Sequence, residues 1–383
     1  MHLANFDIAG FLRDYWQRRP LLIRNPWDRW RNPLEGDELA GLACEKGVES
    51  RLVVRQGGEW QVENGPIPAA RFGELGADPW TLLVQAVDHH VPQVAALIEP
   101  FRFIPDWRID DVMVSYADHG GGVGPHFDQY DVFLIQGQGT RRWRIGRACN
   151  EATPLLDHPE LRLLARFEPS VEWLLEPGDI LYLPPGTAHD GSAEGDNCMT
   201  YSVGFRAPSR GELIGNWADD LLAEMREDDR YADPGLAAQD NPGEIRAEAL
   251  ERLHAMITER MADRGAFARW FGRYSSTPKY PDMDWQPEQA LDAAAVRALI
   301  GQGAALLRNP ASRFAFIREN TGDVLLFVDG ESYPCAGNLA PLAEALCARP
   351  DPMLDPALGQ SAEAARLLAE LVNRGALAFA VQD

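Results

Sequence analysis

The sequence predicts an α+β protein in which a small antiparallel β-barrel or jelly roll is followed by two helix-rich segments. Residues 101–206 contain short apolar runs punctuated by glycine and proline, with little helical periodicity. After about residue 208 the pattern changes to that of amphipathic helices. The chain has 383 residues, of which 45% are hydrophobic, enough for two or three packed domains.

The first hundred residues predict mixed structure. Residues 6–19 form a short helical pattern that stops at Pro20, and the apolar strand Leu21–Ile23 follows. Residues 51–66 alternate around two glycines, as in a β-hairpin. Residues 78–101 have a helical pattern that a proline at position 92 breaks or restarts.

Five apolar runs predict the barrel, and the chain beyond them predicts two further parts. The runs are residues 111–117, 130–138, 140–146, 172–186 and 199–208. We therefore expect a catalytic barrel domain over residues 1–207 and a helical region over residues 208–275. A proline-bearing linker then leads to a helix, a hairpin and two helices, which predict a small winged-helix-like domain over residues 285–383.

The helical region contains an apolar helix face that needs a partner. Ile245, Leu250, Leu253 and Ile257 lie on one side of the expected helix. We expect this face to pack against a second copy in a homodimer. The alternative is that it covers the barrel of its own chain.

Composition and charge exclude several classes of protein. The net charge of −22 repels nucleic acid and would attract a basic partner, although acidity also serves solubility alone. The winged-helix hairpin and the helix after it are not basic, so direct DNA binding is not expected. Five widely spaced cysteines without a Cys-x-x-Cys motif argue against a disulfide framework and a thiolate zinc site. No apolar run approaches the length of a membrane span, and we expect a cytoplasmic protein.

A glycine-rich run at residues 120–124 leads into His126-Phe127-Asp128. A dinucleotide fingerprint is excluded because a strand follows instead of a helix, and no phosphate-loop lysine is present. Because residues two apart on a strand face the same side, His126 and Asp128 would point together into the barrel. His189, after a Pro-Pro-Gly turn, would complete a two-histidine, one-carboxylate triad of the kind that holds non-haem Fe(II).

Three arginines surround Trp143 on the strand after this motif. Arg141 and Trp143 share one face, whereas Arg142 and Arg144 share the other. An arginine directed into a barrel needs an anion, because a buried charge without a partner is costly. The inward arginine therefore predicts a site for the distal carboxylate of a dicarboxylic co-substrate, and we expect Arg142 and Arg144 to lie outside with acidic partners.

These residues resemble the JmjC-type 2-oxoglutarate oxygenases of the cupin superfamily. The stretches "GGGVGPHFDQYDVFLIQGQGTRRWRIG", "YLPPGTAHDG" and "FLRDYWQRRPLLIR" are similar to the bacterial ribosomal oxygenase branch. The resemblance implies a double-stranded β-helix core, a helical dimerisation region and a C-terminal winged-helix domain. It also implies Fe(II), 2-oxoglutarate and dioxygen as cofactor and co-substrates, and 3-hydroxylation of an arginine in a basic large-subunit ribosomal protein.

The resemblance transfers roles to particular residues. It assigns iron to His126, Asp128 and His189, and the 5-carboxylate of 2-oxoglutarate to Arg141, fifteen positions after the first ligand. It places Ser115, Asn197 and Tyr201 near the co-substrate, although Ser115 could equally be satisfied within its strand. A substrate arginine needs a carboxylate near the mouth, for which Asp118 is the first candidate and Asp131 the second; either could instead be a turn residue.

Two other functions remain open at this stage. The first is a cupin-type metal-dependent dioxygenase or isomerase of small molecules, which would not need Arg141. The second is a non-enzymatic scaffold that uses its winged-helix domain for binding. The sequence does not fix the substrate residue, the oxidised carbon or the metal that is loaded.

Overall fold

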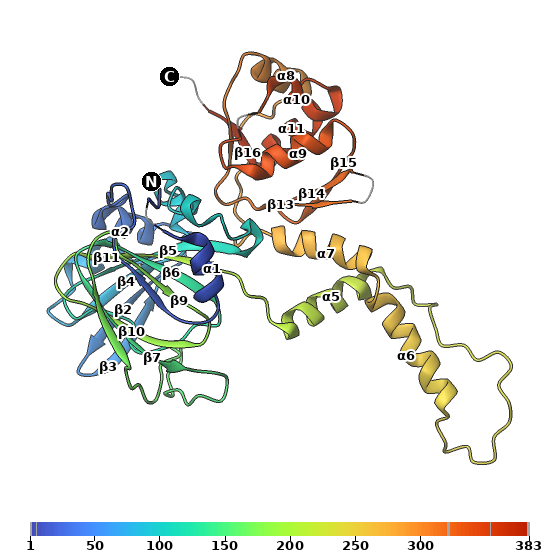
Figure 1. Cartoon of the computed structure of the whole chain (residues 1–383), viewed down its shortest axis with the longest axis horizontal. Coiled ribbons are helices and arrows are strands. Elements are labelled where there is room, and N and C mark those ends of the chain that lie inside the picture. Colours follow the sequence, from blue (N-terminus) through green and yellow to red (C-terminus); the bar gives the residue numbers. More distant parts are fainter. Residues whose placement is uncertain (1, 5, 320–321, 353, 381–383) are drawn as a thin grey trace. The chain divides into compact units, whose positions relative to one another are not determined.

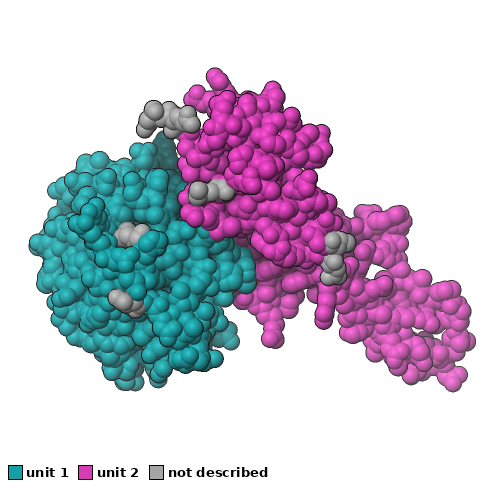
Figure 2. Space-filling view, turned by 45° about the horizontal axis from the view of Figure 1, so that its top comes forward, with its two compact units in different colours: residues 1–207, 279–285, 309–311 teal, residues 208–278, 286–308, 312–383 magenta. Residues whose placement is uncertain are grey.

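The computed structural model describes residues 2–4, 6–319, 322–352 and 354–380. It divides into two compact units, which are coloured separately in Figure 2 and described here one at a time. The first comprises Met1–Ala207 with Lys279–Trp285 and Asn309–Ala311, and the second comprises the remainder. Within these described ranges, no helix is long and apolar enough to span a membrane.

The first unit is built on two antiparallel sheets that form the barrel (Figure 1). The larger sheet, as far as the chain is described, has the strand order β1-β9-β6-β11-β5-β4-β2-β3. Its strands are β1 (Leu21–Ile23), β2 (Ser50–Gln56), β3 (Glu59–Asn64), β4 (Trp80–Val84), β5 (Ile109–Ala117), β6 (Asp131–Gln138), β9 (Ile180–Leu183) and β11 (Cys198–Phe205). The smaller sheet has the order β10-β7-β8 and consists of β7 (Arg141–Ala148), β8 (Val171–Leu175) and β10 (Thr187–Ala193).

The two faces of the larger sheet bury different cores. Val132 and Leu134 of β6 pack against Trp143 and Ile145 of β7, so this face is the barrel interior. The alternate residues, such as Phe133, face a larger aromatic core beneath the N-terminal segments. Strand alternation therefore decides whether a side chain enters the barrel or the outer core.

Short helices of the first unit cover that outer core. They are α1 (Ile8–Asp14), α2 (Gly36–Cys44), α3 (Ala69–Gly73), α4 (Pro92–Ala95) and the 3₁₀ turns η1 (Val87–His89), η2 (Glu99–Phe101) and η3 (Asp106–Arg108). The expected helical pattern from residue 78 is wrong in its first part, because Trp80–Val84 is strand β4. This strand lies between β2 and β5 and is largely buried, so its apolar residues are continuous and do not show the apolar–polar alternation that identifies a strand.

The second unit contains three longer helices and the winged-helix-like fold. The helices are α5 (Arg210–Glu224), α6 (Ala247–Met261) and α7 (Arg264–Ser276). The remainder comprises α8 (Ala293–Gly301), α9 (Leu339–Ala348), α10 (Pro356–Gly359) and α11 (Ala362–Asn373), with β12 (Leu306–Arg308), β13 (Phe314–Arg318), β14 (Val324–Val328), β15 (Glu331–Cys335) and β16 (Leu377–Phe379). One apolar core joins α8, α9 and α11 to the sheet β13-β14-β15.

A buried acid is hydrogen-bonded to the backbone of β5. Asp88, in η1, is 2% exposed, and its carboxyl accepts a hydrogen bond from the Val112 backbone N–H at 2.8 Å. Burial, together with the neighbouring carboxylate of Asp111, raises the pKa of Asp88 to about 7. The folded protein therefore keeps a proton here that the unfolded chain releases near pH 4.

We expect Asp88→Asn to remove a pH dependence of stability. The folded-state pKa exceeds the unfolded one, so the contribution of Asp88 to stability falls as the pH rises from about 4 to about 7. The free energy of unfolding of the variant relative to the natural protein should therefore rise by roughly 2–3 kcal/mol between pH 5 and pH 8. Denaturant unfolding of metal-free protein at both pH values measures this difference, and a difference that does not change with pH would contradict the assignment.

Candidate metal centre

A backbone pair brings two distant histidines together. His126 and His189 form an isolated antiparallel bridge, with N–O distances of 2.9 Å and 2.8 Å in the two directions. His189 lies on β10, and residues 120–126 run beside that strand. The approach requires glycine, because a Cβ on Gly122 would lie 2.2 Å from the carbonyl oxygen of Gly191.

Three ligand atoms converge at this bridge. Asp128 Oδ2 lies 3.6 Å from His189 Nε2 and 4.0 Å from His126 Nε2. One ligand atom from each of the three residues lies within 4.8 Å of the others. Two imidazoles and one carboxylate on one side of a site leave the opposite positions of an octahedral metal open.

The hydrogen bonds of both rings prepare them to bind a cation. Nδ1 of His126 lies 2.9 Å from the Gly124 carbonyl oxygen, and Nδ1 of His189 lies 2.8 Å from that of Thr187. Because a carbonyl only accepts, Nδ1 carries the proton and Nε2 keeps its lone pair for the metal. Burial and the nearby His126 lower the pKa of His189 to about 4, so this ring is neutral at physiological pH.

Arg141 lies inside the barrel without a partner for its charge. The residue is 4% exposed, and within the described chain its Nε and Nη2 atoms are buried without hydrogen bonds. Its guanidinium lies 5.7 Å from the Trp143 ring centre. An unpaired buried guanidinium is costly, so this position fits a ligand carboxylate.

Arg142 and Arg144 of β7 lie outside the barrel, as the alternation predicts. Arg142 pairs with Glu172 and Glu194, and Arg144 Nη2 lies 2.5 Å from Asp190 Oδ2. Their charges are therefore satisfied by acids on neighbouring strands. This difference between positions one residue apart marks Arg141 as the arginine available to a ligand.

Buried polar side chains lie on the barrel faces of β5, β6 and β11. Ser115 is 5% exposed and pairs in register with Thr200, whose hydroxyl donates to Gln136 Oε1 at 3.2 Å. Ser115 thus remains a predicted co-substrate contact. Gln136 and Thr200 were not among the predicted residues, although each lies two positions from a residue that faces the barrel, which is a pattern visible in the sequence.

The structure turns two predicted site residues away from the barrel. Asp131 is fully buried in the outer core, where its carboxylate accepts from Tyr182 Oη at 2.6 Å and Gln17 Nε2 at 2.9 Å. Tyr201 lies in the same core and donates to Asn32 Oδ1 at 2.9 Å. Both predictions are wrong, because these residues lie on the opposite strand faces from Leu134 and Thr200.

Two other predicted residues lie at the wrong end of the barrel. Asp118 follows β5 at the end where Ala117 pairs with Cys198. A hydrogen bond between the side chains of Asp118 and Asp196 raises the pKa of Asp196. Asn197, in the adjoining turn, accepts from the Tyr116 hydroxyl. The triad adjoins the other end of these strands, since Asp128 leads into β6 where that strand pairs with the end of β11. Asp118 and Asn197 are therefore not brought together with the triad.

A different carboxylate lies at the triad end. Asp111 is 5% exposed and shares a strand face with Ser115, four residues further along β5. A Cβ on Gly204 of β11 would lie 3.8 Å from Asp111 Oδ1, so this oxygen faces the barrel side of β11. Partial burial, with the carboxylates of Asp128 and Asp111, raises the pKa of the Tyr130 hydroxyl. Tyr130 therefore lies close enough to both Asp128 and Asp111 for their charges to act on its hydroxyl.

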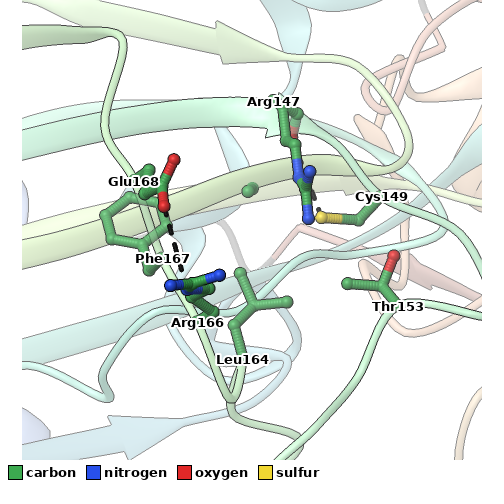
Figure 3. Close-up of a pocket in the computed structure, with 8 residues that line it drawn as sticks. Arg147, Cys149, Thr153, Leu164, Arg166, Phe167 and Glu168 are labelled. Atoms are coloured by element: carbon green, nitrogen blue, oxygen red, sulfur yellow. Dashed lines mark hydrogen bonds and ion pairs between the residues drawn. The ribbon is translucent and has the colours of Figure 1, made fainter.

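A surface pocket lies outside this centre (Figure 3). Figure 3 shows Arg147, Arg166, Cys149 and Thr153 around it, and Ala188 of β10 also contributes. None of the three triad residues lines it. The pocket therefore does not contribute to the metal centre.

The triad within an antiparallel barrel is typical of cupin-fold metal enzymes, and comparison with known proteins identifies the class as the JmjC oxygenases. A JmjC domain model matches residues 96–213, a ROXA-like winged-helix model matches residues 259–378, and an AraC-like ligand-binding model matches residues 168–271. The predicted class, a 2-oxoglutarate-dependent oxygenase with a jelly-roll core and a winged helix, is confirmed.

Close relatives define the family within this class. The chain is 43% identical over 304 residues to the ribosomal protein uL16 3-hydroxylase of Escherichia coli K12, covering 78% of this chain and 79% of that protein. The X-ray structure of E. coli YcfD matches with a TM-score of 0.90 at 37% identity, covering 99% and 100% of the two chains. YcfD in complex with cobalt and 2-oxoglutarate matches with a TM-score of 0.87 at 38% identity, covering 99% of each chain. The chain belongs to the bacterial ribosomal oxygenase family.

We expect Arg141→Met to separate ligand binding from stability. The variant removes an unpaired buried charge, so the protein alone should be as stable as the natural protein or more stable. In the presence of an inert divalent metal, 2-oxoglutarate should raise the Tm of the natural protein but not of the variant. Thermal unfolding with and without 2-oxoglutarate measures both effects. Equal stabilisation of the two proteins by 2-oxoglutarate would favour a cupin that does not use Arg141.

Proposed function

We propose that this enzyme hydroxylates an arginine side chain of a basic large-subunit ribosomal protein. The main support is the convergence of His126, Asp128 and His189 beside an inward Arg141 without a partner. The relative named a uL16 3-hydroxylase makes uL16 the first substrate to test. The donor set and the buried guanidinium fit Fe(II) and 2-oxoglutarate, respectively.

Each residue of the centre has a distinct task in this proposal. His126, Asp128 and His189 hold Fe(II), and their backbone hydrogen bonds keep the two Nε2 atoms directed at it. Arg141 binds the distal carboxylate of 2-oxoglutarate, with Ser115 as a second contact. When bound, iron and 2-oxoglutarate together activate dioxygen for C–H hydroxylation. The apolar barrel wall, with Trp143 and Ile145, excludes water from the co-substrate.

We assign the substrate guanidinium to Asp111 in place of Asp118. Asp111 lies on the barrel face at the triad end, with Tyr130 beside it, whereas Asp118 adjoins the far end of β5. A carboxylate at this position can bind a guanidinium through charge-assisted hydrogen bonds. The net charge of −22 would also speed encounter with a basic protein.

Incubation of ribosomal proteins with enzyme, Fe(II) and 2-oxoglutarate is expected to add about 16 Da, the mass of one oxygen, to one protein. Tandem mass spectrometry should place the oxygen on an arginine, and the shift should require both Fe(II) and 2-oxoglutarate.

Asp111→Asn should reduce kcat/KM at least about tenfold, because it removes the charge that binds the guanidinium. Asp118→Asn is the matched control and should retain activity. Loss of activity in the control alone would reverse the assignment.

We further propose that the protein is cytoplasmic and that its three domains span residues 1–207, 208–275 and 285–383.

We also propose that the protein forms a homodimer through helix α6. Three apolar side chains of this helix, Leu250, Leu253 and Ile257, are 53%, 42% and 62% exposed on a single chain. An apolar stripe of this kind is normally covered. We propose a docking or dimerisation role for the winged helix and no direct DNA binding, in keeping with the acidic charge.

Light scattering after size exclusion is expected to give twice the 42.5 kDa mass of one chain. The double variant Leu253→Asp, Ile257→Asp should be monomeric, because two buried charges would oppose packing of the α6 faces. Its circular dichroism should match that of the natural protein. A monomeric mass for the natural protein would overturn the dimer proposal.

A further inference from the structure

Lys279 is a rare residue type in this chain, and its position is specific. Lysine occurs only at positions 46 and 279, among 36 lysines and arginines. Lys279 belongs to the segment Lys279–Trp285, which packs as part of the barrel unit. Its Nζ lies 2.7 Å from Asp111 Oδ2 and 3.2 Å from Asp110 Oδ2. One ammonium therefore bridges the two acids at the start of β5.

These contacts fix one oxygen of Asp111 and leave the other on the barrel side. Oδ2 accepts from Lys279 and also from the Ala86 backbone N–H at 3.0 Å. Oδ1 faces Gly204, towards the barrel side of β11. The two donors thus set the rotation of the carboxylate, with its outer oxygen held and its inner oxygen directed at the mouth.

Lys279 also lies within a cluster of acidic side chains. Asp88 and Asp110 both lie close to Asp111, and the Lys279 side chain is 23% exposed against 7% for Asp111. Burial raises the pKa of the Asp111 carboxyl, and the positive charge of Lys279 opposes that rise. Without the ammonium, Asp111 would face two acids in a site of low dielectric.

The segment that carries Lys279 is itself fastened to the barrel unit. The Tyr280 hydroxyl donates to Glu49 Oε2 at 2.8 Å, and its ring packs edge-on against His89 at 6.0 Å. Pro278 and Pro281 flank the pair and restrict the backbone on both sides. The ammonium is therefore presented to Asp111 by an anchored segment.

We propose that Lys279 is a positioning residue for the substrate: it holds the Asp111 carboxylate so that its inner oxygen can receive the substrate's cationic side chain. This inference rests on the proposed function and extends it to a residue more than 160 positions from the barrel strand that it supports. A compact ammonium suits the task, because one point charge can bridge Asp110 and Asp111 where a planar guanidinium would prefer a single carboxylate.

The test compares Lys279→Met, Lys279→Gln and Lys279→Arg, with Lys46→Met as the matched control at an exposed lysine. The substrate is a synthetic uL16 peptide that spans the hydroxylated arginine. The two neutral variants should raise the KM for the peptide about tenfold or more, with a smaller change in kcat. Lys279→Arg should restore part of the loss, and Lys46→Met should behave as the natural protein. Peptide-independent turnover of 2-oxoglutarate in the same samples reports that each variant is folded.

The pH profile distinguishes positioning from a merely structural role. Removal of Lys279 should let Asp111 take up a proton at higher pH, so the KM ratio of Lys279→Gln to the natural protein should grow from pH 8.5 to pH 6. The other titratable groups near Asp111 include Asp88, Asp110, Tyr130 and Tyr280, with His89 beside Asp88 and Glu49 beside Tyr280, and they are common to both proteins.

The outcomes separate this inference from the proposed function. If the natural protein hydroxylates the peptide and the neutral variants keep its KM at every pH, the role of Lys279 is overturned and the function stands. If the natural protein hydroxylates no arginine, the proposed function fails and the inference fails with it. If Lys279→Met loses peptide-independent turnover and is therefore misfolded, the KM values of Lys279→Gln and Lys279→Arg test the role of Lys279 instead. Equal KM values for those two variants would also overturn the role.

Discussion

The backbone pair between His126 and His189 is the constraint on which the candidate centre depends. It joins the glycine-rich segment before β6 to β10 of the smaller sheet, and it sets two imidazoles side by side. Neighbouring carbonyl groups orient the rings, because each Nδ1 donates to a main-chain oxygen two residues before its own histidine. The glycine run follows from this arrangement, since only a residue without a side chain can approach β10 so closely at position 122.

Charge inside the barrel is handled differently at Arg141 and at Asp111. Arg141 is buried without a counter-ion in the protein, which costs stability and creates an affinity for a carboxylate. Asp111 has a resident cation on one oxygen only. Arg141 can thus bind an anion inside the barrel, and Asp111, at the same end as the triad, can bind a cation. The arrangement agrees with the chemistry of the ribosomal oxygenase family to which the chain belongs.

Strand alternation explains why neighbouring residues have unrelated roles. Arg141 faces the interior while Arg142 pairs with surface acids, and Thr200 faces the interior while Tyr201 fills the outer core. The outer core is rich in aromatic residues and holds the N-terminal segments against the larger sheet. The polar groups buried there, such as Asp131, are satisfied locally and are unavailable to a ligand.

The sequence by itself determined the features that depend on local spacing. The two-residue alternation of side chains predicted that His126 and Asp128 share one side and that Arg141 and Arg142 do not. The Pro-Pro-Gly turn indicated His189 as the third ligand. Only the tertiary structure decided which end of the barrel each strand terminus occupies, because that depends on the register between strands that are distant in sequence. Asp111 lies on β5 and Asp118 directly follows this strand, yet pairing with β11 places the two residues at opposite ends of the barrel. Lys279 reaches Asp111 from beyond the helical region, and no local pattern encodes a contact made across 168 residues.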